Sequence, residues 1–225
     1  MIEAPSPSRP LQGGRTAAGR PPAQWVRVYH REPGRIPDGT TPRSWGPVGR
    51  FDPRPGGHDG PREHPNGPTV HYSGDTLPVA LTEAFRGAPV WSVCPAWRAA
   101  LLIATTEALQ DLGPDGAVAL GPPADLGHRP DYTRASTQAW ARAILADLPV
   151  GAVAGARYHS ARQPDGENVV LWNRQPIAVL GALGAEDVAL HDEAAWPWVL
   201  VAAHRLGASV ERILITDCAR HNGDA

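Results

Sequence analysis

The alternation of apolar and polar positions predicts several short strands. In QWVRVYH (24–30), Trp25, Arg27 and Tyr29 share one face while valines occupy the other, which is a pattern typical of a strand. Similar or continuously apolar runs predict further strands over residues 69–73, 100–106, 154–160, 168–173, 176–182 and 212–217. The turn QPDGE joins the strands over 154–160 and 168–173, so we expect these two to form a hairpin.

A spacing of four between apolar residues predicts helices. The clearest helix covers 136–148, where Ser136 or Thr137 would cap it and Trp140, Ile144 and Leu148 would share a face. Two more helices are expected, one capped by Asp75 and running to about Arg86 with Pro78 in its first turn, the other over 192–206 and ended by Gly207. A short helix is also expected after residue 106. Strand pairs flanked by few helices indicate a mixed α+β fold.

Two segments lack any periodic pattern. Residues 1–22 contain mainly Pro, Gly, Arg and Ser, so we expect a disordered N-terminal tail followed by one domain over 23–225. Residues 31–68 are rich in proline and glycine, which predicts a long irregular loop. Within that loop, SWGPVGRFDP (44–53) places Arg50 between glycine, proline and aromatic residues, the kind of rigid surface that commonly carries binding side chains.

Composition narrows the possible chemistry. The 225 residues are 42% apolar, enough for a proper core, and the net charge of −2 gives no general reason to expect binding to nucleic acid or an anionic membrane. All 21 basic residues are arginine. Without lysine, a Schiff-base enzyme, an ordinary phosphate-loop NTPase and a kinase are excluded. Ten of these arginines, against six acidic residues, fall within 1–69, so positive charge is concentrated in the first third of the chain.

Metal and thiol chemistry finds little support in the sequence. Cys94 and Cys218 are 124 positions apart, so we expect neither a thiolate zinc site nor a disulfide framework, and we expect a location in the reducing cytoplasm. The spacing of His58, His64 and His71 fits no helix face, so we expect no metal there. No apolar run is long enough for a membrane span, and the first residues lack an apolar signal core.

Familiar catalytic motifs are absent from the sequence. It contains no G-x-G-x-x-G after a strand, no G-x-S-x-G elbow and no H-E-x-x-H. His159 and Ser160 are neighbours, but adjacent residues on a strand point to opposite faces, so they cannot act together as base and nucleophile. A serine hydrolase is therefore disfavoured.

Five stretches in chain order resemble the RES domain, a family named for its Arg, Glu and Ser. They are WVRVYH, GRFDP, VHYSGDTLPVALTEAF, AWARAILADLPVGAVAGARYHS and ENVVLWN, spread from about residue 24 to 182. The resemblance implies a fold similar to the ADP-ribosyltransferases and an activity that destroys NAD by breaking its nicotinamide–ribose bond. RES proteins typically act as toxins of bacterial toxin–antitoxin pairs, with a Xre-type antitoxin as partner. NAD would be the substrate, and no cofactor is expected.

The matching motifs imply six site residues. They are Glu83, Arg50 and Tyr72 as catalytic residues, and Arg27, Ser160 and Asn168 as substrate-binding residues. The residue types suit the chemistry, because guanidinium groups grip a pyrophosphate through paired hydrogen bonds and a carboxylate stabilises an oxocarbenium-like ribose. Water, phosphate or a protein could accept the ADP-ribose, so hydrolysis, phosphorolysis and ADP-ribosyl transfer stay open, together with a catalytically silent protein-binding module.

Two departures from the family pattern bear on the site. Phe51-Asp52 follows the second arginine where the family often has Trp-Asn, and residues 54–68 resemble an insertion. A carboxylate beside a pyrophosphate site is expected to weaken affinity for NAD, while Phe51 is expected to pack the turn. Trp25, Trp140 and Trp172 are expected in the core rather than against substrate.

Overall fold

The computed structural model describes the chain in segments. These are residues 23–55, 60–85, 88–104, 109–113, 126, 133–147, 154–163, 165–173, 180–182 and 187–220. The predicted tail over 1–22 and His58 lie outside them. The described chain forms two compact units: unit 1 within Pro42–Tyr72 and Thr105–Val179, and unit 2 within Ala23–Thr41, Ser73–Ala104 and Leu180–Ala225. No helix in these segments is long and apolar enough to cross a membrane.

Unit 1 is a small sheet with one long helix. Its elements are β2 (Trp45–Gly46), β3 (Arg62–Glu63), most of β4 (Thr69–Gly74), β7 (Leu109–Asp111), α3 (Arg134–Asp147), β8 (Gly155–His159) and β9 (Glu167–Asn173). The strand order is β4, β9, β8, β7, with β8 antiparallel to β9 and parallel to β7, while β2 and β3 form a separate short pair. Because β8 and β9 follow each other through a short turn, the predicted hairpin is confirmed.

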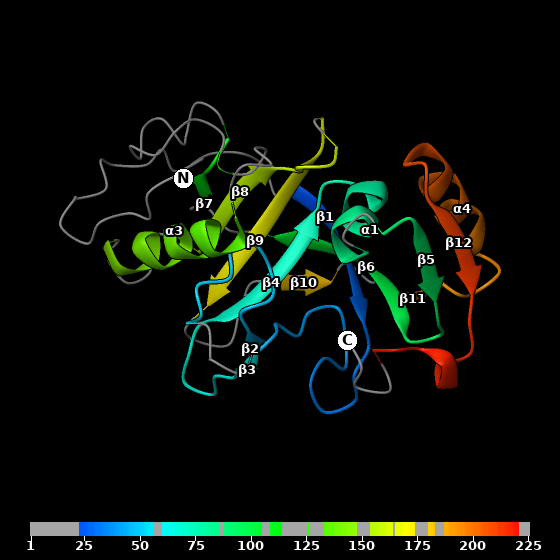
Figure 1. Cartoon of the computed structure of the whole chain (residues 1–225), viewed down its shortest axis with the longest axis horizontal. Coiled ribbons are helices and arrows are strands. Elements are labelled where there is room, and N and C mark those ends of the chain that lie inside the picture. Colours follow the sequence, from blue (N-terminus) through cyan, green and yellow to red (C-terminus); the bar gives the residue numbers. More distant parts are fainter. Residues whose placement is uncertain are drawn as a thin grey trace. The chain divides into compact units, whose positions relative to one another are not determined.

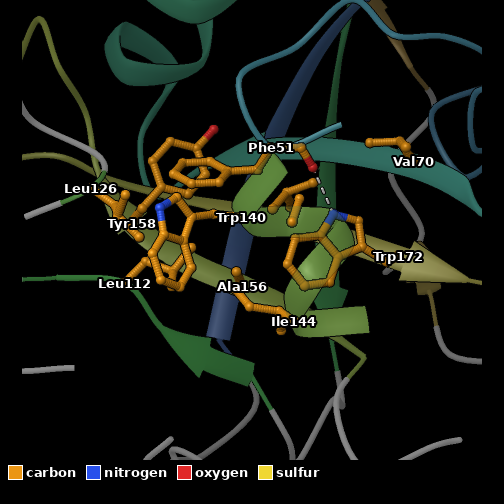
Figure 2. Packing of buried hydrophobic residues seen from close by; sticks show 11 residues of the cluster. Phe51, Val70, Leu112, Leu126, Trp140, Ile144, Ala156, Tyr158 and Trp172 are labelled. Atoms are coloured by element: carbon orange, nitrogen blue, oxygen red, sulfur yellow. Dashed lines mark hydrogen bonds between the residues drawn. The ribbon is translucent and has the colours of Figure 1, made fainter. Parts of the chain in front are cut away.

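The core of unit 1 lies where α3 meets the sheet (Figures 1 and 2). Trp140 and Ile144 from one face of α3 pack with Tyr158 of β8 and Trp172 of β9. Phe51 enters the same cluster from the long loop, with its ring centroid 4.6 Å from that of Tyr158. Each large side chain buried here contributes about 1.5 to 3 kcal/mol to folding. The expected places of Trp140, Trp172 and Phe51 in the core are confirmed.

Unit 2 is built around a long central strand. Its elements are β1 (Ala23–His30), α1 (Leu77–Ala84), β5 (Val90–Val93), β6 (Trp97–Ala104), β10 (Leu180–Ala182), β11 (Val188–Ala189), α4 (Trp196–Arg205), β12 (Ser209–Arg212) and the 3₁₀ turn η1 (Ile215–Asp217). The strand β6 pairs antiparallel with β1, β10 and β11, and β5 pairs in parallel with β12. Figure 1 shows β5 and β12 running side by side with α4 next to them.

Two helices and β5 share the main core of unit 2. Leu81 from α1 and Val199 from α4 lie in one buried cluster with Trp91 and Val93 of β5. Phe85, at the end of α1, stacks on Trp91 with ring centroids 5.2 Å apart. Trp25 is also buried, as expected. Both helices of unit 2 are short, so apolar contacts with β5 hold them in place.

The mixed α+β prediction is confirmed, since the described part holds α1, α3 and α4 with strands in both directions. Strands were predicted close to their observed bounds for β1, β4, β8 and β9, and Gly207 ends α4 with a positive φ of 65°. Within 31–68 the described residues are mostly irregular, as expected from the prolines, with only β2, β3 and isolated bridges.

Several boundaries were predicted wrongly. Thr76, not Asp75, caps α1, because its hydroxyl accepts a hydrogen bond from the Val79 amide at 3.4 Å. Helix α3 begins at Arg134, and Thr133 rather than Ser136 or Thr137 accepts a first-turn amide, that of Ser136 at 3.2 Å. Helix α4 starts four residues later than predicted, at Trp196.

The last predicted strand is also wrong. Residues 212–217 form a strand only at Arg212, the end of β12, and continue into η1. Of the apolar residues in this run, Ile213 packs against the core of unit 2, whereas Leu214 is 68% exposed and Ile215 is 38% exposed. After β6, the described residues 109–113 contain the strand β7 where a short helix was expected, and the remainder of that prediction lies outside the described residues. The strand β5 was not predicted.

Candidate functional site

The six predicted site residues are divided between the units. Unit 1 carries Arg50, Tyr72, Ser160 and Asn168, and unit 2 carries Arg27 and Glu83.

The loop that carries Arg50 is fixed from both sides. The amide of Gln138 on α3 donates to the Gly49 carbonyl at 2.9 Å, and the Trp172 indole on β9 donates to the Phe51 carbonyl at 2.8 Å (Figure 2). Phe51 itself is completely buried. Arg50 lies between these two anchored residues and is partly exposed. The surrounding core therefore holds the backbone on either side of the guanidinium, which limits where that side chain can point.

Asp52 forms a buried ionic cluster under this loop. Its Oδ2 accepts from Arg43 Nη2 at 2.7 Å and from the Val48 amide at 3.0 Å, and its Oδ1 lies 3.5 Å from Arg54 Nη1. Arg54 also donates to the carbonyls of Arg43 and Trp45, and both Asp52 and Arg54 are completely buried. Burial lowers the pKa of the Arg54 guanidinium, and the charge of Asp52 opposes that shift.

This arrangement gives Asp52 another role than the one expected from the sequence. A carboxylate beside a pyrophosphate site would repel substrate, but Asp52 has no exposed surface and contacts two arginines. Two positive charges surround one negative charge, so the cluster does not add negative potential to the loop. Asp52 instead orders the turn, and sequence reasoning missed Arg43 and Arg54 as its partners because their roles depend on the folded loop.

Tyr72 lies against the loop of Arg50. A Cβ placed on Gly49 would overlap the Tyr72 phenol, with the ring carbon Cε2 only 2.8 Å away. The Arg43 guanidinium carbon lies 6.0 Å from the centre of the same ring. Glycine at position 49 therefore allows the backbone next to Arg50 to approach Tyr72 closely.

Ser160 and Asn168 belong to the β8–β9 hairpin, and both are almost fully buried. The Ser160 hydroxyl accepts from the amides of Arg162 and Gln163, both at 3.3 Å, and its own amide donates to the Gly166 carbonyl at 2.8 Å. Asn168 pairs in register with Tyr158 across the hairpin. The serine thus closes the turn, with its hydroxyl already accepting from backbone amides.

Arg27 is a buried arginine on β1 of unit 2. Its Nη1 donates to the carbonyls of Gly39 at 2.8 Å and Thr41 at 2.6 Å, and its guanidinium lies 5.1 Å from the Tyr29 ring centre. Asp38 shapes the same turn, because its carboxylate accepts from the amides of Thr40 and Thr41. The Thr40 hydroxyl also donates to this carboxylate at 2.7 Å. This hydroxyl bond, followed by the other hydrogen bonds from Thr40 and Thr41, lowers the pKa of Asp38. Arg27 therefore orders the turn over residues 38–41 of the long loop.

Glu83 lies near the end of α1 and is partly buried. The residues before it, Val79 to Thr82, are buried, so the helix faces the core of unit 2 along most of its length. The Thr82 hydroxyl donates back to the Pro78 carbonyl at 2.8 Å. Glu83 is the one acidic residue of α1, whose sequence is LPVALTEA. The packing of α1 thus fixes the backbone that carries the glutamate.

Sequence reasoning missed one cluster of potential ligands. Cys94 and Cys218, which the sequence separates by 124 positions, lie together in unit 2 with His30. All three residues are buried. Burial raises the pKa of the Cys94 thiol to about 11. The fold thus brings together two cysteines that are far apart in the sequence.

Comparison with known families decides the relationship of the chain. The family model of the RES domain matches residues 25–194. The chain belongs to the RES domain family. The RES match includes all six predicted site residues and begins within β1, while α4, β12 and η1 follow after its end. No curated protein and no solved structure matches the chain.

Proposed function

We propose that this RES domain degrades NAD by breaking the bond between nicotinamide and ribose, with water or phosphate as acceptor. The observation that supports the proposal best is the loop of Arg50, which Gln138 and Trp172 anchor on both sides of a partly exposed guanidinium. A rigid, forked cation of this kind suits a pyrophosphate, because it makes paired, charge-assisted hydrogen bonds. Membership of the RES family, which is associated with NAD-acting toxins, agrees with this substrate.

The remaining residues of unit 1 suit other parts of the dinucleotide. Tyr72 offers an aromatic face for the nicotinamide ring, and it lies against Gly49, next to Arg50. Ser160 and Asn168 supply neutral hydrogen-bonding groups at the hairpin, where Ser160 already holds the turn. Under this proposal the anchored loop and the hairpin give the substrate site a fixed geometry before NAD arrives, which reduces the cost of ordering it on binding.

Glu83 is proposed as the residue that stabilises the transition state. As nicotinamide departs, positive charge develops on the ribose, and a carboxylate lowers the energy of that oxocarbenium-like centre or holds a ribose hydroxyl. Arg27 is proposed to assist in binding the phosphates, either directly or by ordering the turn around Gly39 and Thr41 that it already contacts. Both assignments rest on the order of the RES motifs.

The proposal includes a biological role. The RES resemblance implies an ADP-ribosyltransferase-like fold together with the NAD-degrading activity. The role that we propose is that of a toxin held inactive by a Xre-type antitoxin. Transfer of ADP-ribose to a protein is the alternative activity, and it differs from the proposed one only in the acceptor.

Release of nicotinamide from NAD by the purified chain tests the proposal. We expect release by the wild type and a loss of at least about a hundredfold in Glu83→Gln, since losing one such electrostatic interaction typically costs about 3 to 4 kcal/mol. Glu211→Gln, an exposed acid on β12 outside the RES match, is the matched control and should keep full activity. Product analysis with and without phosphate distinguishes hydrolysis from phosphorolysis.

Three results would count against the proposal. Nicotinamide release by Glu83→Gln at close to the wild-type rate would remove Glu83 from the site. Label from adenine-labelled NAD on a protein would indicate ADP-ribosyl transfer instead. No release of nicotinamide by a folded, antitoxin-free wild type would favour a silent binding module.

A further inference from the structure

Three metal-binding side chains meet in the core of unit 2, outside the set of residues proposed to act on NAD. His30 ends β1, Cys94 follows β5, and Cys218 follows η1, and their potential ligand atoms all lie within 4.8 Å of one another. None of the three is more than 3% exposed. Three separate segments of the chain therefore bring one imidazole and two thiols to a single buried point.

The distances match a tetrahedral metal shell. His30 Nε2 lies 3.5 Å from Cys94 Sγ and 3.5 Å from Cys218 Sγ. With Zn–S bonds of about 2.3 Å and a Zn–N bond of about 2.0 Å, tetrahedral angles place nitrogen and sulfur about 3.5 Å apart. The same nitrogen is equidistant from both sulfurs, which is the relation expected when all three atoms face one ion.

The surroundings of His30 orient its ring for this purpose. Nδ1, the nitrogen away from the sulfurs, lies 3.9 Å from the Glu32 carboxylate, and the ring meets Trp97 edge-on with centroids 5.4 Å apart. A carboxylate near the second nitrogen of a metal-binding histidine favours the tautomer that leaves Nε2 as the ligand. Trp97 excludes water from one side of the ring. Glu32 and Trp97 are therefore positioning residues for the cluster.

Charge and ligand type favour zinc. Two thiolates and one neutral imidazole around a divalent ion give a neutral group, which is the state that a buried site accommodates at lowest cost. Thiolate and imidazole ligands select zinc over magnesium or calcium, which prefer oxygen.

We propose that His30, Cys94 and Cys218 bind one zinc ion, which fastens the C-terminal segment of the chain to β1 and the end of β5. Cys218 lies beyond the end of the RES match at residue 194, whereas His30 and Cys94 lie within it. The ion joins the RES part of unit 2 to the segment that follows it. Three protein ligands leave the fourth position of the tetrahedron for water or another group. The inference is independent of the activity on NAD.

Metal analysis of the full chain tests the proposal. The protein is produced in zinc-supplemented medium and purified without chelator, and its zinc content is measured by mass spectrometry of the elements. We expect about one zinc per chain, following the ligand set of such sites. Cys94→Ser and Cys218→Ser should each lose most of it, since a serine hydroxyl is a poor zinc ligand. His204→Gln, at an exposed position of α4, is the control and should keep the metal.

Cobalt substitution provides a second measurement, which can be made on the folded wild type. Exchange of zinc for Co²⁺ in the wild type should give a sulfur-to-cobalt charge-transfer band, weakened in Cys218→Ser. Limited proteolysis should release the segment after β12 faster in Cys218→Ser, and in the wild type after chelation, than in the zinc-loaded wild type.

Two outcomes would overturn the proposal. One is a wild type whose zinc content equals that of the Cys94→Ser and Cys218→Ser variants and which gives no cobalt–sulfur band. The other is a molecular mass of the chain, measured under non-reducing conditions, that is lower than the mass of the reduced chain by two hydrogens. That result would mean that Cys94 and Cys218 form a disulfide instead.

Discussion

At the residue scale, Asp52 shows how one buried charge can organise a loop. Arg43 and Arg54 approach its carboxylate from two sides, and the Val48 amide completes its contacts. Removing the carboxylate would leave two buried guanidinium groups facing each other. Breaking such a pair typically costs more than the pair contributes, because the remaining charge stays buried without compensation.

Asp52→Asn, which keeps the shape and removes the charge, is therefore expected to lower the free energy of unfolding by about 3 to 5 kcal/mol. Chemical denaturation followed by tryptophan fluorescence measures this change. Glu193→Gln is the matched control, because Glu193 pairs with Arg212 in the open, with its side chain 88% exposed, and screening by solvent leaves such a pair without measurable effect. Equal effects of the two substitutions would mean that the Asp52 cluster contributes nothing special.

Gly49 tests the contact between the loop and Tyr72. Gly49→Ala forces either the phenol or the loop to move, since a Cβ there would overlap the ring. A displacement of about 1 Å at a reacting centre can cost a hundredfold in rate, so we expect a loss of about that size in nicotinamide release. Gly113→Ala is the control in the same unit, where the nearest atom to the new Cβ, an Asp111 oxygen, would be 3.1 Å away and no ring would be overlapped. Full activity of Gly49→Ala would separate this loop from catalysis.

At the element scale, the sequence predicts what its own periodicity determines. The alternation around Arg27 defines β1, and the turn after Ser160 defines the hairpin, because each pattern lies within a few neighbouring residues. Caps are harder to predict, since Asp75 and Thr76 are both good capping residues and only the backbone geometry selects Thr76. The apolar run after Arg212 resembles a strand, but β5 pairs with the residues before it.

The site shows the same limit over longer distances. The RES motifs indicate Arg50 and Glu83 from short stretches of sequence. Gln138 and Trp172 anchor the residues on either side of Arg50. They lie 89 and 121 positions along the chain from Gly49 and Phe51, the residues that they contact. Cys94 and Cys218 likewise come close to each other only in the folded chain, so no local sequence pattern could predict that they are neighbours.

Thr76 provides a prediction for the helix that carries Glu83. Thr76→Ala removes the hydroxyl that accepts the Val79 amide, and loss of a cap typically lowers stability by about 0.5 to 2 kcal/mol. Thr76→Ser keeps an acceptor and should remain close to the wild type. Denaturation of the three proteins by urea measures the difference. If alanine and serine behave alike, the long 3.4 Å bond has no part in holding α1.

At the scale of the whole molecule, charge suggests how activity is controlled. Arginine is concentrated in the first third of the chain, where Arg31, Arg35 and Arg62 are exposed, so a partner that covers these residues is expected to present an acidic surface. An enzyme that consumes NAD cannot stay active at high level in its own cell. We expect control from outside, by an antitoxin that blocks the residues proposed to bind NAD.

Expression in a bacterial host tests this expectation. Wild type alone should deplete cellular NAD and arrest growth, whereas Glu83→Gln, or co-expression with an antitoxin encoded beside it, should leave NAD at its normal level. Cellular NAD and growth are measured together after induction. Abundant wild-type protein with normal NAD would argue against a toxin.

The division of the chain between the two units has a consequence for its synthesis on the ribosome. Unit 2 draws on three stretches, and β12, the parallel partner of β5, emerges more than a hundred residues after it. A nascent chain that has exposed β1, β5 and β6 still lacks α4, β12 and Cys218, so the apolar face around Trp91 cannot yet be covered. Unit 2 can close only after α4 and β12 have left the ribosome. A chain truncated before α4 should therefore leave this apolar face exposed and fail to fold in this region.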